Sequence, residues 1–491
     1  MKRIITILLA VAFIHCALPA QEFRYKIEAT GTIAGEKTPP TWHLSNRQGL
    51  SGDVARFGYL RTALEGTQEL GGDFGLDWGV DVVAGKNLTS TLFVQQAFAD
   101  ISWKMLALSA GQKERWGELK NHRLSSGGLV ESGNARPIPQ IRIEVPEYYD
   151  FFGTNGWFKL RGHLAYGWFT DGEWQKDWVA QDMARTVGVR YHSKAVFFKF
   201  GKEERYPLSA ELGLQMTAQF GGTVYNKENV KGDHYHNPSR LKDYFKAFVP
   251  SSGDDEYSQL DKTNIAGNQL GSWHAAINWT AKDWKLRAYY EHVFDDHSQM
   301  FWEYGLWTEQ LVGLELELKN GHWIKGIVLE YYNLKNQSGP VYHDTTDDIP
   351  DQVSCRDDNY NHEWYNGWFN YGMVIGTPLA TSPIYNEDNI LTCYNNRVEA
   401  FHFGIEGEPT EEIGYRLLIT HSNNWGTYDR PFTDVKSNTA GLVEVSYKPK
   451  FLKGWSVQAS YAFDNGSLLG NCRSGMLTIS KCGIINLGKK K

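Results

Sequence analysis

Residues 323–333 read Trp-Ile-Lys-Gly-Ile-Val-Leu-Glu-Tyr-Tyr-Asn, and the alternation within them decides the fold. Ile327, Leu329 and Tyr331 occupy every second position, and Glu330 lies between them. Because successive side chains of a strand point to opposite faces, one face can meet an apolar phase while the other carries a carboxylate. The alternation then stops, and a polar, aromatic-rich excursion follows as far as residue 386. A loop of this length is unusual in a soluble domain and typical of an outer-membrane barrel.

The same two-residue period recurs in other segments. The positions on one face are Phe74, Leu76, Trp78, Val80 and Val82 in one segment, Ile141, Ile143 and Val145 in a second, Trp284, Leu286, Ala288 and Tyr290 in a third, and Trp455, Val457, Ala459, Tyr461 and Phe463 in a fourth. A soluble β-sandwich also alternates, so the period alone leaves both fold classes open. Trp and Tyr at the segment ends favour a membrane barrel, whose two interfaces are ringed by amphipathic aromatic side chains.

The composition excludes a helical membrane protein. Aromatic residues make up 14% of the chain, the mean hydropathy is −0.46, and no run of about 20 apolar residues follows the N-terminal segment. Barrel strands need apolar side chains only at every second residue, which reconciles abundant aromatics with low hydropathy. The net charge of −7 argues against a nucleic-acid partner.

Residues 1–20 have the pattern of a cleaved secretory signal. Lys2 and Arg3 precede an apolar run, residues 4–14, that is too short to cross a membrane as a helix. We therefore expect residues 1–20 to be a signal peptide and residues 21–491 to form the exported barrel with its loops.

Segments with strand-like alternation number about 18 from Phe23 onward, an even number as expected for a bacterial barrel with both termini on one side. Their connections alternate between short turns and long loops. The long connections are residues 36–53, 113–136, 226–270, 294–307, 334–396 and 422–439, with the short connection at residues 85–89 as the exception. The sequence predicts an all-β fold: a transmembrane, antiparallel, up-and-down β-barrel of about 18 strands in the bacterial outer membrane, with long extracellular loops.

One short helix is predicted in the loop at residues 226–270. Asn237 can cap it, and Pro238 suits its first turn. Three large apolar residues would share one face of this helix: Leu241, Phe245 and Phe248. Two interpretations stay open, a helix that packs within its own loop and a helix that plugs the barrel lumen.

Aromatic residues concentrate in the predicted external loops, interspersed with Asn, Asp and His. Sugar rings present apolar C–H faces that stack on aromatic rings, and hydroxyls that bond to such polar side chains. The candidate polysaccharide-binding residues are Trp302, Tyr304, Trp307, Asp344, Asn359, Tyr360, Asn361, His362, Trp364, Tyr365, Trp368, Trp425 and Tyr428. The alternative is that these rings form a self-packed loop core or part of the interface girdle, and the pattern leaves the two open.

Signatures of catalytic and metal sites are missing from the sequence, which has no HExxH, no CxxC pair and no complete calcium loop. Asp295-Asp296 and His343-Asp344 share no scaffold spacing, so they are interpreted as polar loop residues. Charged residues in the predicted strands have mixed signs, which favours ion pairs across the bore as readily as a selectivity filter. We expect no enzymatic activity, no cofactor and no metal.

Four cysteines follow the predicted signal peptide: Cys355, Cys393, Cys472 and Cys482. Cys355 and Cys393 belong to one external loop and can pair in an oxidising compartment, so a disulfide between them is a candidate. Cys472 and Cys482 fall near opposite ends of the last strand, far beyond bridging distance. Four free thiols are the alternative.

Three sequence blocks carry a family resemblance: QSGPVYHD at residues 337–344, DNYNHEWYNGW at 358–368 and GTPLATSPIYN at 376–386. GNQLGSW at residues 267–273 and NWGTY at 424–428 add to it. These blocks are similar to the Wzi-type capsule assembly proteins. The resemblance implies an outer-membrane β-barrel that holds capsular polysaccharide at the cell surface without catalysis.

The partners implied by the resemblance and the fold are capsular or other surface polysaccharide, outer-membrane lipid and the machinery that assembles outer-membrane barrels. A passive or saccharide-selective porin is the alternative function. Enteric members of the family carry a helical bundle ahead of the barrel. Because strand signals begin at Phe23, we expect no such bundle in this chain.

Overall fold

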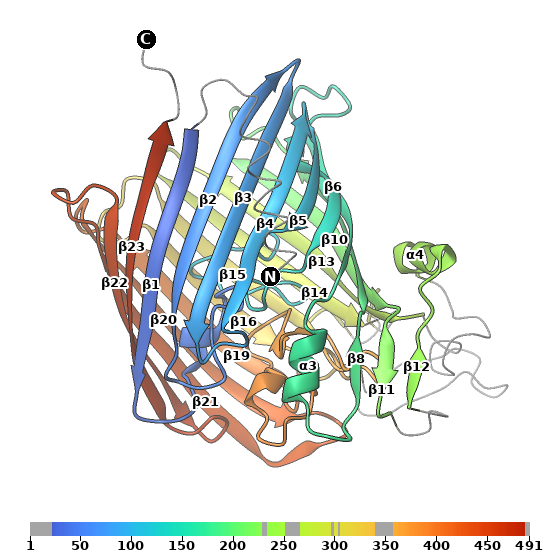
Figure 1. Cartoon of the computed structure of the whole chain (residues 1–491). Coiled ribbons are helices and arrows are strands. Elements are labelled where there is room, and N and C mark those ends of the chain that lie inside the picture. The colour runs from blue at the N-terminus through green and yellow to red at the C-terminus, as the bar shows by residue number, and fades with distance from the viewer. Residues whose placement is uncertain are drawn as a thin grey trace.

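The computed structural model describes residues 22–227, 233–250, 266–295, 299–302, 305–338 and 357–486. An 18-stranded antiparallel sheet closes on itself where β1 (Glu22–Ala34) pairs with β23 (Cys472–Asn486) (Figure 1). Every other strand pairs with its neighbours along the chain, so the topology is up-and-down. The predicted all-β barrel is therefore confirmed. The predicted signal peptide lies outside the described residues.

Between β1 and β23 the barrel strands are β2 (Gly58–Gly71), β3 (Phe74–Lys86), β4 (Leu92–Trp103), β5 (Leu106–Gln112), β6 (Gln140–Tyr149), β7 (Phe158–Trp168), β9 (Arg190–Phe200), β10 (Leu208–Phe220), β13 (Asn268–Thr280), β14 (Trp284–Asp295), β15 (Gln310–Leu318), β16 (Gly326–Asn333), β19 (Val398–Gly407), β20 (Ile413–Gly426), β21 (Pro431–Tyr447) and β22 (Trp455–Gly466). The connections contain a three-stranded sheet of β8 (Arg185–Val187), β11 (Thr223–Tyr225) and β12 (His234–His236), and a two-stranded sheet of β17 (Phe369–Asn370) and β18 (Met373–Val374). Their helices are α2 (Thr41–Leu44), α3 (Gly172–Trp178), α4 (Leu241–Phe248) and the 3₁₀ turn η1 (Pro383–Tyr385).

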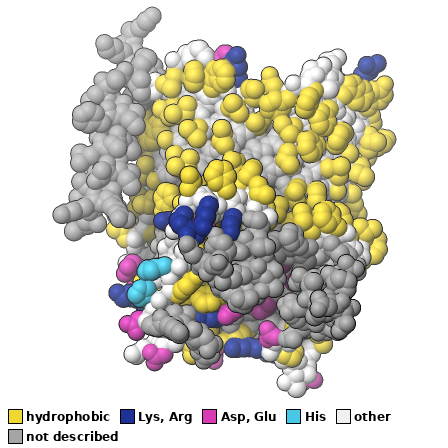
Figure 2. Space-filling model, turned by 90° about the vertical axis from the view of Figure 1, so that its right-hand side faces the viewer, with side chains coloured by type: hydrophobic (Ala, Val, Ile, Leu, Met, Phe, Trp, Pro, Cys, Tyr) yellow, Lys and Arg dark blue, Asp and Glu magenta, His cyan; other side chains and the backbone are white. Residues whose placement is uncertain are grey.

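Apolar side chains cover the outside of the barrel and polar side chains line its inside. In β10, Leu208 and Leu212 are 51% and 52% exposed, whereas Ser209 and Glu211 on the opposite face are 2% and 4% exposed. Figure 2 shows the resulting band of hydrophobic side chains, with charged side chains gathered below it. A soluble barrel would turn its apolar face inward, so this arrangement requires an apolar phase around the wall. Among the described residues, no helix has the length and apolar character needed to cross a membrane.

The two rims of the barrel differ in their connections. Glu22 of β1 pairs with Asn486 of β23 at one rim, where the turns are short, and we call this rim the short-turn end. The opposite rim, the long-loop end, carries the connections at residues 35–57, 113–139, 169–189, 221–267, 296–309 and 334–397. The predicted asymmetry between long loops and short turns is therefore present.

The prediction of a long loop at residues 422–439 is wrong. β20 and β21 continue through it and are joined by residues 427–430 alone. Ser422 and Asn424 on β20 are buried, and Asn424 Nδ2 donates to Ser422 Oγ at 3.1 Å. Other positions of these strand ends carry exposed polar side chains such as Asp434 and Ser437. Polar residues therefore occupy both faces, and the hydropathy alternation disappears.

The predicted helix is confirmed as α4, but it starts later than expected. Its N-cap is Arg240, whose backbone N–H donates to Asp243 Oδ2 at 2.6 Å. Asn237 lies before the helix, where its backbone N–H donates to the Gly222 carbonyl oxygen at 2.9 Å. Figure 1 places α4 outside the barrel wall, so it is not a lumen plug.

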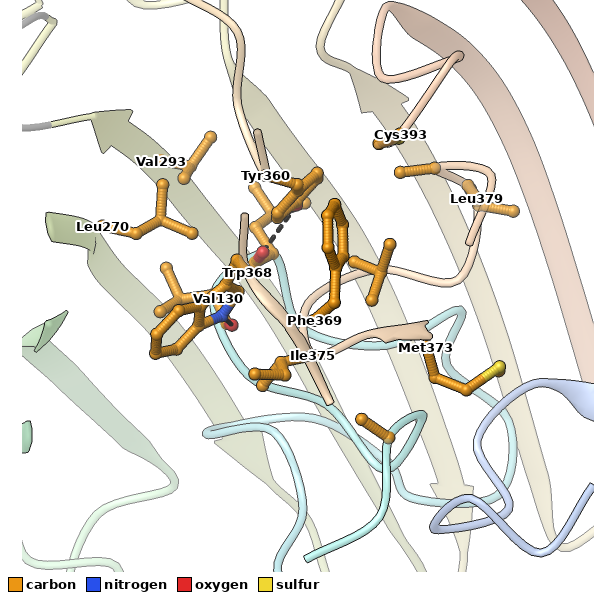
Figure 3. Close-up of a cluster of buried hydrophobic side chains, with 14 of the residues drawn as sticks. Val130, Leu270, Val293, Tyr360, Trp368, Phe369, Met373, Ile375, Leu379 and Cys393 are labelled. Carbon is orange, nitrogen blue, oxygen red and sulfur yellow. Dashed lines mark hydrogen bonds between the residues drawn. The ribbon is translucent and has the colours of Figure 1, made fainter. Parts of the chain in front are cut away.

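Loops of the long-loop end fold into the barrel and fill part of its lumen. We call residues 35–57, 113–139 and 357–397 the plug. Apolar side chains of residues 113–139 and 357–397 form a buried cluster with residues of the wall (Figure 3), and Trp42 packs with Leu124 in a second cluster. The plug contributes Leu129, Val130, Tyr360, Tyr365, Trp368, Phe369, Met373, Val374 and Ile375, and the wall contributes Leu270, Val293, Leu311 and Tyr332, among others. The barrel therefore has an apolar core inside its polar lining, at the long-loop end.

Candidate functional site

Three of the predicted sugar-binding rings belong to the core of the plug. Tyr360, Tyr365 and Trp368 are 2%, 3% and 1% exposed. Tyr360 OH donates to the Leu129 carbonyl oxygen at 2.6 Å, and Trp368 Nε1 donates to the Val130 carbonyl oxygen at 2.7 Å (Figure 3). A sugar cannot stack on rings that protein atoms cover on both faces. For these three residues, the structure agrees with the alternative interpretation from the sequence, in which the rings form a self-packed loop core.

The polar residues of the same block hold the plug loop in shape. Asn361 Oδ1 accepts the backbone N–H of Cys393 at 2.7 Å, and its Nδ2 donates to the Cys393 carbonyl oxygen at 3.0 Å. Asn359 is buried and accepts a bond through its carbonyl oxygen from Asn396 Nδ2 at 2.8 Å. His362 Nδ1 accepts the Trp364 backbone N–H at 3.0 Å. Burial, and secondarily the charge of Lys227, lowers the pKa of His362 to about 3, so the ring is neutral at physiological pH.

Trp364 differs from its neighbours because it is only partly buried. Its carbonyl oxygen accepts Thr186 Oγ1 at 2.6 Å, and its ring centroid lies 5.2 Å from that of Tyr235. Thr186 and Tyr235 belong to the small sheet of β8, β11 and β12. Trp364 therefore joins the plug to this sheet outside the barrel interior.

A second set of predicted residues remains accessible at the long-loop end. Trp425 and Tyr428 are partly exposed and flank the tight link between β20 and β21. Lys335 Nζ lies 4.4 Å from the centroid of the Trp425 ring, and Arg397 Cζ lies 3.8 Å from that of Tyr428. Each pair is within the range of a cation–π interaction.

These residues form one connected surface, which we call the rim cluster: Lys335, Tyr394, Arg397, Trp425, Tyr428 and Arg430. Arg397 Nε donates to the Lys335 carbonyl oxygen at 2.9 Å, and the Trp425 backbone N–H donates to the Arg397 carbonyl oxygen at 3.0 Å. Arg430 Cζ lies 5.1 Å from the centroid of the Tyr394 ring. The cluster combines three cations with three aromatic rings at neighbouring strand ends.

Local sequence explains how the link between β20 and β21 presents these side chains. Gly426 has φ of +78°, and a Cβ there would lie 2.6 Å from the Arg430 carbonyl oxygen, so the turn requires glycine. The Arg430 backbone N–H donates to Thr427 Oγ1 at 3.0 Å and closes the turn. Tyr428 OH donates to the Asn336 carbonyl oxygen at 2.6 Å, which fixes its ring beside Arg397.

Of the rim cluster, only Trp425 and Tyr428 were among the binding residues predicted from the sequence. Lys335, Tyr394, Arg397 and Arg430 were not predicted. A usable signal was present, because β16, β19 and β20 are consecutive barrel strands. Residues that flank the ends of neighbouring strands at one rim must meet, and Lys335, Arg397 and Trp425 occupy such positions.

The remaining candidates lie elsewhere or outside the described residues. Trp302 packs on the barrel wall, where its ring stacks on Trp273 and His292 at centroid distances of 6.1 and 5.2 Å, as an interface aromatic does. Trp307 is 72% exposed before β15, and no described contact joins it to the rim cluster. Tyr304, Asp344 and Cys355 lie outside the described residues, so the role proposed for each stays a prediction.

Cys393 is completely buried, and its Sγ lies 3.2 Å from the Asn395 carbonyl oxygen. Burial raises the pKa of this thiol well above its ordinary value. Cys393 is a free thiol in the structure, and Cys355 lies outside the described residues, so the pairing of the two stays a prediction. Cys472 and Cys482 lie on β23 as free thiols, the first buried and the second exposed, as the argument from strand spacing predicts.

Charged residues inside the barrel form ion pairs around a polar cavity of about 580 Å³ on the short-turn side of the plug. Arg161 pairs with Glu118 at 2.7 Å, and Arg287 pairs with Glu211 at 3.1 Å. The first pair joins the wall to the plug, and the second joins β14 to β10. In the described part of the chain, no group of three or more His, Cys, Asp or Glu residues is arranged to hold a metal ion.

No protein-family model matches the chain, and no curated protein sequence matches it. Among solved structures, it is similar to Wzi of Escherichia coli, an outer-membrane protein involved in group 1 capsule assembly and described as a carbohydrate-binding β-barrel. That match has a TM-score of 0.55 and 13% identity, and it covers 97% of this chain and 87% of Wzi. This chain has the fold of an outer-membrane β-barrel.

Two other solved barrels have lower TM-scores. Acinetobacter baumannii OccAB2 gives a TM-score of 0.48 at 10% identity, and Pseudomonas aeruginosa OccK5 gives 0.48 at 8% identity. Each match covers 95% of this chain and 98% of the other. At such identities the similarity to solved structures establishes the fold alone.

Proposed function

We propose that this protein is a non-catalytic outer-membrane barrel that binds capsular or other surface polysaccharide at the rim cluster and holds it at the cell exterior. In this proposal the long-loop end faces outward, as it does in bacterial barrels whose short turns face the periplasm. Outer-membrane lipid surrounds the wall, and the barrel assembly machinery inserts the chain. The similarity to the carbohydrate-binding barrel Wzi supports this function, and it does not indicate which residues of this chain bind the polymer.

The observation that carries the proposal is the grouping of three cations and three aromatic rings at one rim. Aromatic faces stack on the apolar C–H faces of sugars, while guanidinium and ammonium groups bind carboxylates. Lys335 and Arg397 each hold a position over a ring, and Arg430 adds a third cation. This combination suits a polymer that contains uronic acids or other acidic sugars better than a neutral one.

The plug supports attachment over transport. A bore that conducts polymer would need a continuous open path, whereas Tyr360 and Trp368 tie the loop at residues 357–397 to the loop at residues 113–139 across the lumen. The buried apolar cluster around them fills part of the lumen. In this proposal a chain of sugar residues binds at the rim and does not pass through the bore.

Binding of purified capsular polysaccharide to the detergent-solubilised protein tests the proposal. Replacing Trp425 and Tyr428 together by Ala removes two stacking faces, and at about 0.5–1.5 kcal/mol for each face the affinity should fall about 5- to 150-fold. Trp323→Ala is the matched control, because Trp323 is 73% exposed but lies in a turn of the short-turn end. Equal affinities of the two variants would contradict the proposed site.

A solute channel is the second candidate function, and the polar cavities between plug and wall favour it. The cavity of about 580 Å³ beside the plug has a counterpart of about 540 Å³ lined by Arg61, Asp81 and Glu114. Single-channel recording separates the two functions, since an open bore conducts steadily and a plugged one does not. Steady conductance with small ions, together with no polysaccharide binding, would favour the channel.

A further inference from the structure

Helix α4 is attached to the outer surface of the barrel wall (Figure 1). The Tyr244 ring packs edge-on against Phe220 of β10 at 4.9 Å and against Tyr166 of β7 at 5.3 Å between centroids. Tyr166 OH donates to the Tyr244 carbonyl oxygen at 2.9 Å. Ala247 is buried in the same contact. Phe220 and Tyr166 continue the outward-facing rows of their strands, so α4 covers wall positions that would otherwise face the surroundings.

The helix leaves a row of large apolar side chains uncovered. Leu241, Phe245, Phe248 and Val249 are 75%, 65%, 42% and 60% exposed. Leu241, Phe245 and Phe248 are spaced by four and three residues, which puts them on one stripe of the helix, and Val249 follows at the C-cap in an extended conformation. Soluble surfaces rarely gather four such residues, and a contiguous apolar stripe of this kind marks an interaction site.

The apolar stripe borders the outward-facing apolar band of the wall, and its Phe248 ring contacts His192 and Lys194 of β9. On strands next to the helix, Trp168 at the end of β7 and Leu212 of β10 are 44% and 52% exposed on the outward face. Figure 2 shows hydrophobic side chains extending from the band toward the long-loop end, where Lys and Arg side chains gather at its edge. Lys242 and Lys246 lie on the side of α4 next to its apolar stripe by their helical spacing. An apolar stripe beside cationic residues is the pattern of a helix that lies in a membrane interface.

We propose that α4 is a membrane-surface anchor, whose apolar stripe inserts among the acyl chains of the outer leaflet beside the barrel. Lys242 and Lys246 add positive charge at the level of the phosphate-bearing headgroups. The occupant is lipid and not a second protein, because the stripe borders the band that already contacts lipid.

Anchoring α4 also constrains the plug. The helix follows β11 and β12 in the same connection, and β11 pairs with β8 of the connection between β7 and β9. Thr186 Oγ1 of β8 donates to the Trp364 carbonyl oxygen. Tyr235 of β12 packs against the Trp364 ring. The contacts therefore run from the membrane surface through the small sheet to the loop at residues 357–397, and insertion of α4 stabilises the position of that loop.

Site-directed fluorescence in lipid vesicles tests the anchor. Single cysteines at Leu241→Cys, Phe245→Cys and Lys246→Cys, each in a Cys482→Ser background, are labelled with an environment-sensitive fluorophore. The protein is reconstituted into phosphatidylcholine vesicles with or without brominated acyl chains. Labels at positions 241 and 245 should be quenched several-fold more by brominated lipid than by aqueous iodide, and the label at position 246 should show the reverse order. The Cys482→Ser protein without a new cysteine corrects for label on other thiols.

Equal iodide quenching at all three positions would overturn the anchor, because it would place the stripe in water. Shielding from both quenchers that grows with protein concentration would also overturn it, in favour of a second copy of the chain. A Leu241→Glu and Phe245→Glu double variant provides a separate readout. It should keep the gel mobility of a folded barrel and show faster protease cleavage in the loops of the long-loop end. The vesicles contain no polysaccharide, so the outcome is independent of the proposed function.

Discussion

Replacing Trp368 by Ala should loosen the plug without unfolding the barrel. The Trp368 ring is 1% exposed, stacks on Tyr191 of β9 at 6.1 Å and meets Phe169 edge-on at 6.4 Å between centroids. Its Nε1 donates to the Val130 carbonyl oxygen at 2.7 Å. The substitution leaves a cavity in the centre of the plug and an unpaired carbonyl group in the loop at residues 113–139.

The cost can be estimated from these contacts. Truncating a buried Trp to Ala lowers the free energy of unfolding by about 3–5 kcal/mol, and the lost hydrogen bond accounts for about 1 kcal/mol of this loss. Because the strand ladder satisfies its own backbone hydrogen bonds, this loss falls on the loops and not on the wall. Opening of the plug should therefore become more frequent by about two to three and a half orders of magnitude.

Hydrogen–deuterium exchange of the amides at residues 113–139 and 357–397 measures this opening directly. Exchange in both loops should accelerate in Trp368→Ala while the amides of the strands stay protected. Trp307→Ala serves as the control, because Trp307 is 72% exposed and its removal leaves the plug intact. Trp368→Phe, which keeps a ring but loses the N–H donor, should fall between the two. Unchanged loop protection in Trp368→Ala would refute the plug as a cooperative packed unit.

Three further outcomes follow from the structure. Burial raises the pKa of Glu309, which precedes β15 and contacts the plug through Asn359, from its ordinary value of 4.5 to about 8, although its bonds to Gln337 and Asn359 act in the opposite direction. The folded protein then holds a proton that Glu309 releases when the plug opens, so the stability of the plug should fall as pH rises from 4.5 to 8. Exchange rates of the plug amides at several pH values test this, and Glu309→Gln should flatten the profile. Non-reducing peptide mapping should find Cys355 linked to Cys393 and Cys482 free. Alkylation of all four cysteines without prior reduction would show that this disulfide does not form. The protein should fractionate with outer membranes and migrate faster on a gel when it is not heated, whereas recovery from the soluble periplasm would contradict the barrel's placement.

The wall of the barrel could be predicted because its chemistry repeats at short range. Ile327, Leu329 and Tyr331 face outward in β16, and Glu330 is buried on the inner face, as their alternation requires. The same rule fails at residues 422–439, where the strands carry exposed polar side chains such as Asp434 and Ser437 in place of apolar ones. Sequence alternation thus reports lipid exposure, and it ends where the strand leaves the membrane.

The division between plug core and accessible rim could not be predicted, because it depends on distant contacts. Tyr360 and Tyr428 both stand among polar residues in the sequence, yet one is buried and the other partly exposed. Tyr360 is buried because its OH meets the Leu129 carbonyl oxygen, 231 residues away. Nothing local to either tyrosine encodes this difference. Lys335, Arg397 and Arg430 differ, because the predicted up-and-down order already places their segments at neighbouring strand ends of one rim.

Capsule retention by living cells tests the central claim most directly. Cells that lack the protein are complemented with the wild-type chain, with the Trp425→Ala and Tyr428→Ala double variant, or with Trp323→Ala, and the capsular polysaccharide on washed cells is compared with that in the medium. All three proteins should reach the outer membrane at equal abundance, because the side chains of Trp425 and Tyr428 are partly exposed at the rim and not part of the buried core. The double variant should release polysaccharide into the medium while the wild type and the control retain it. Full retention by the double variant at normal abundance would contradict the rim cluster as the site that holds the polymer.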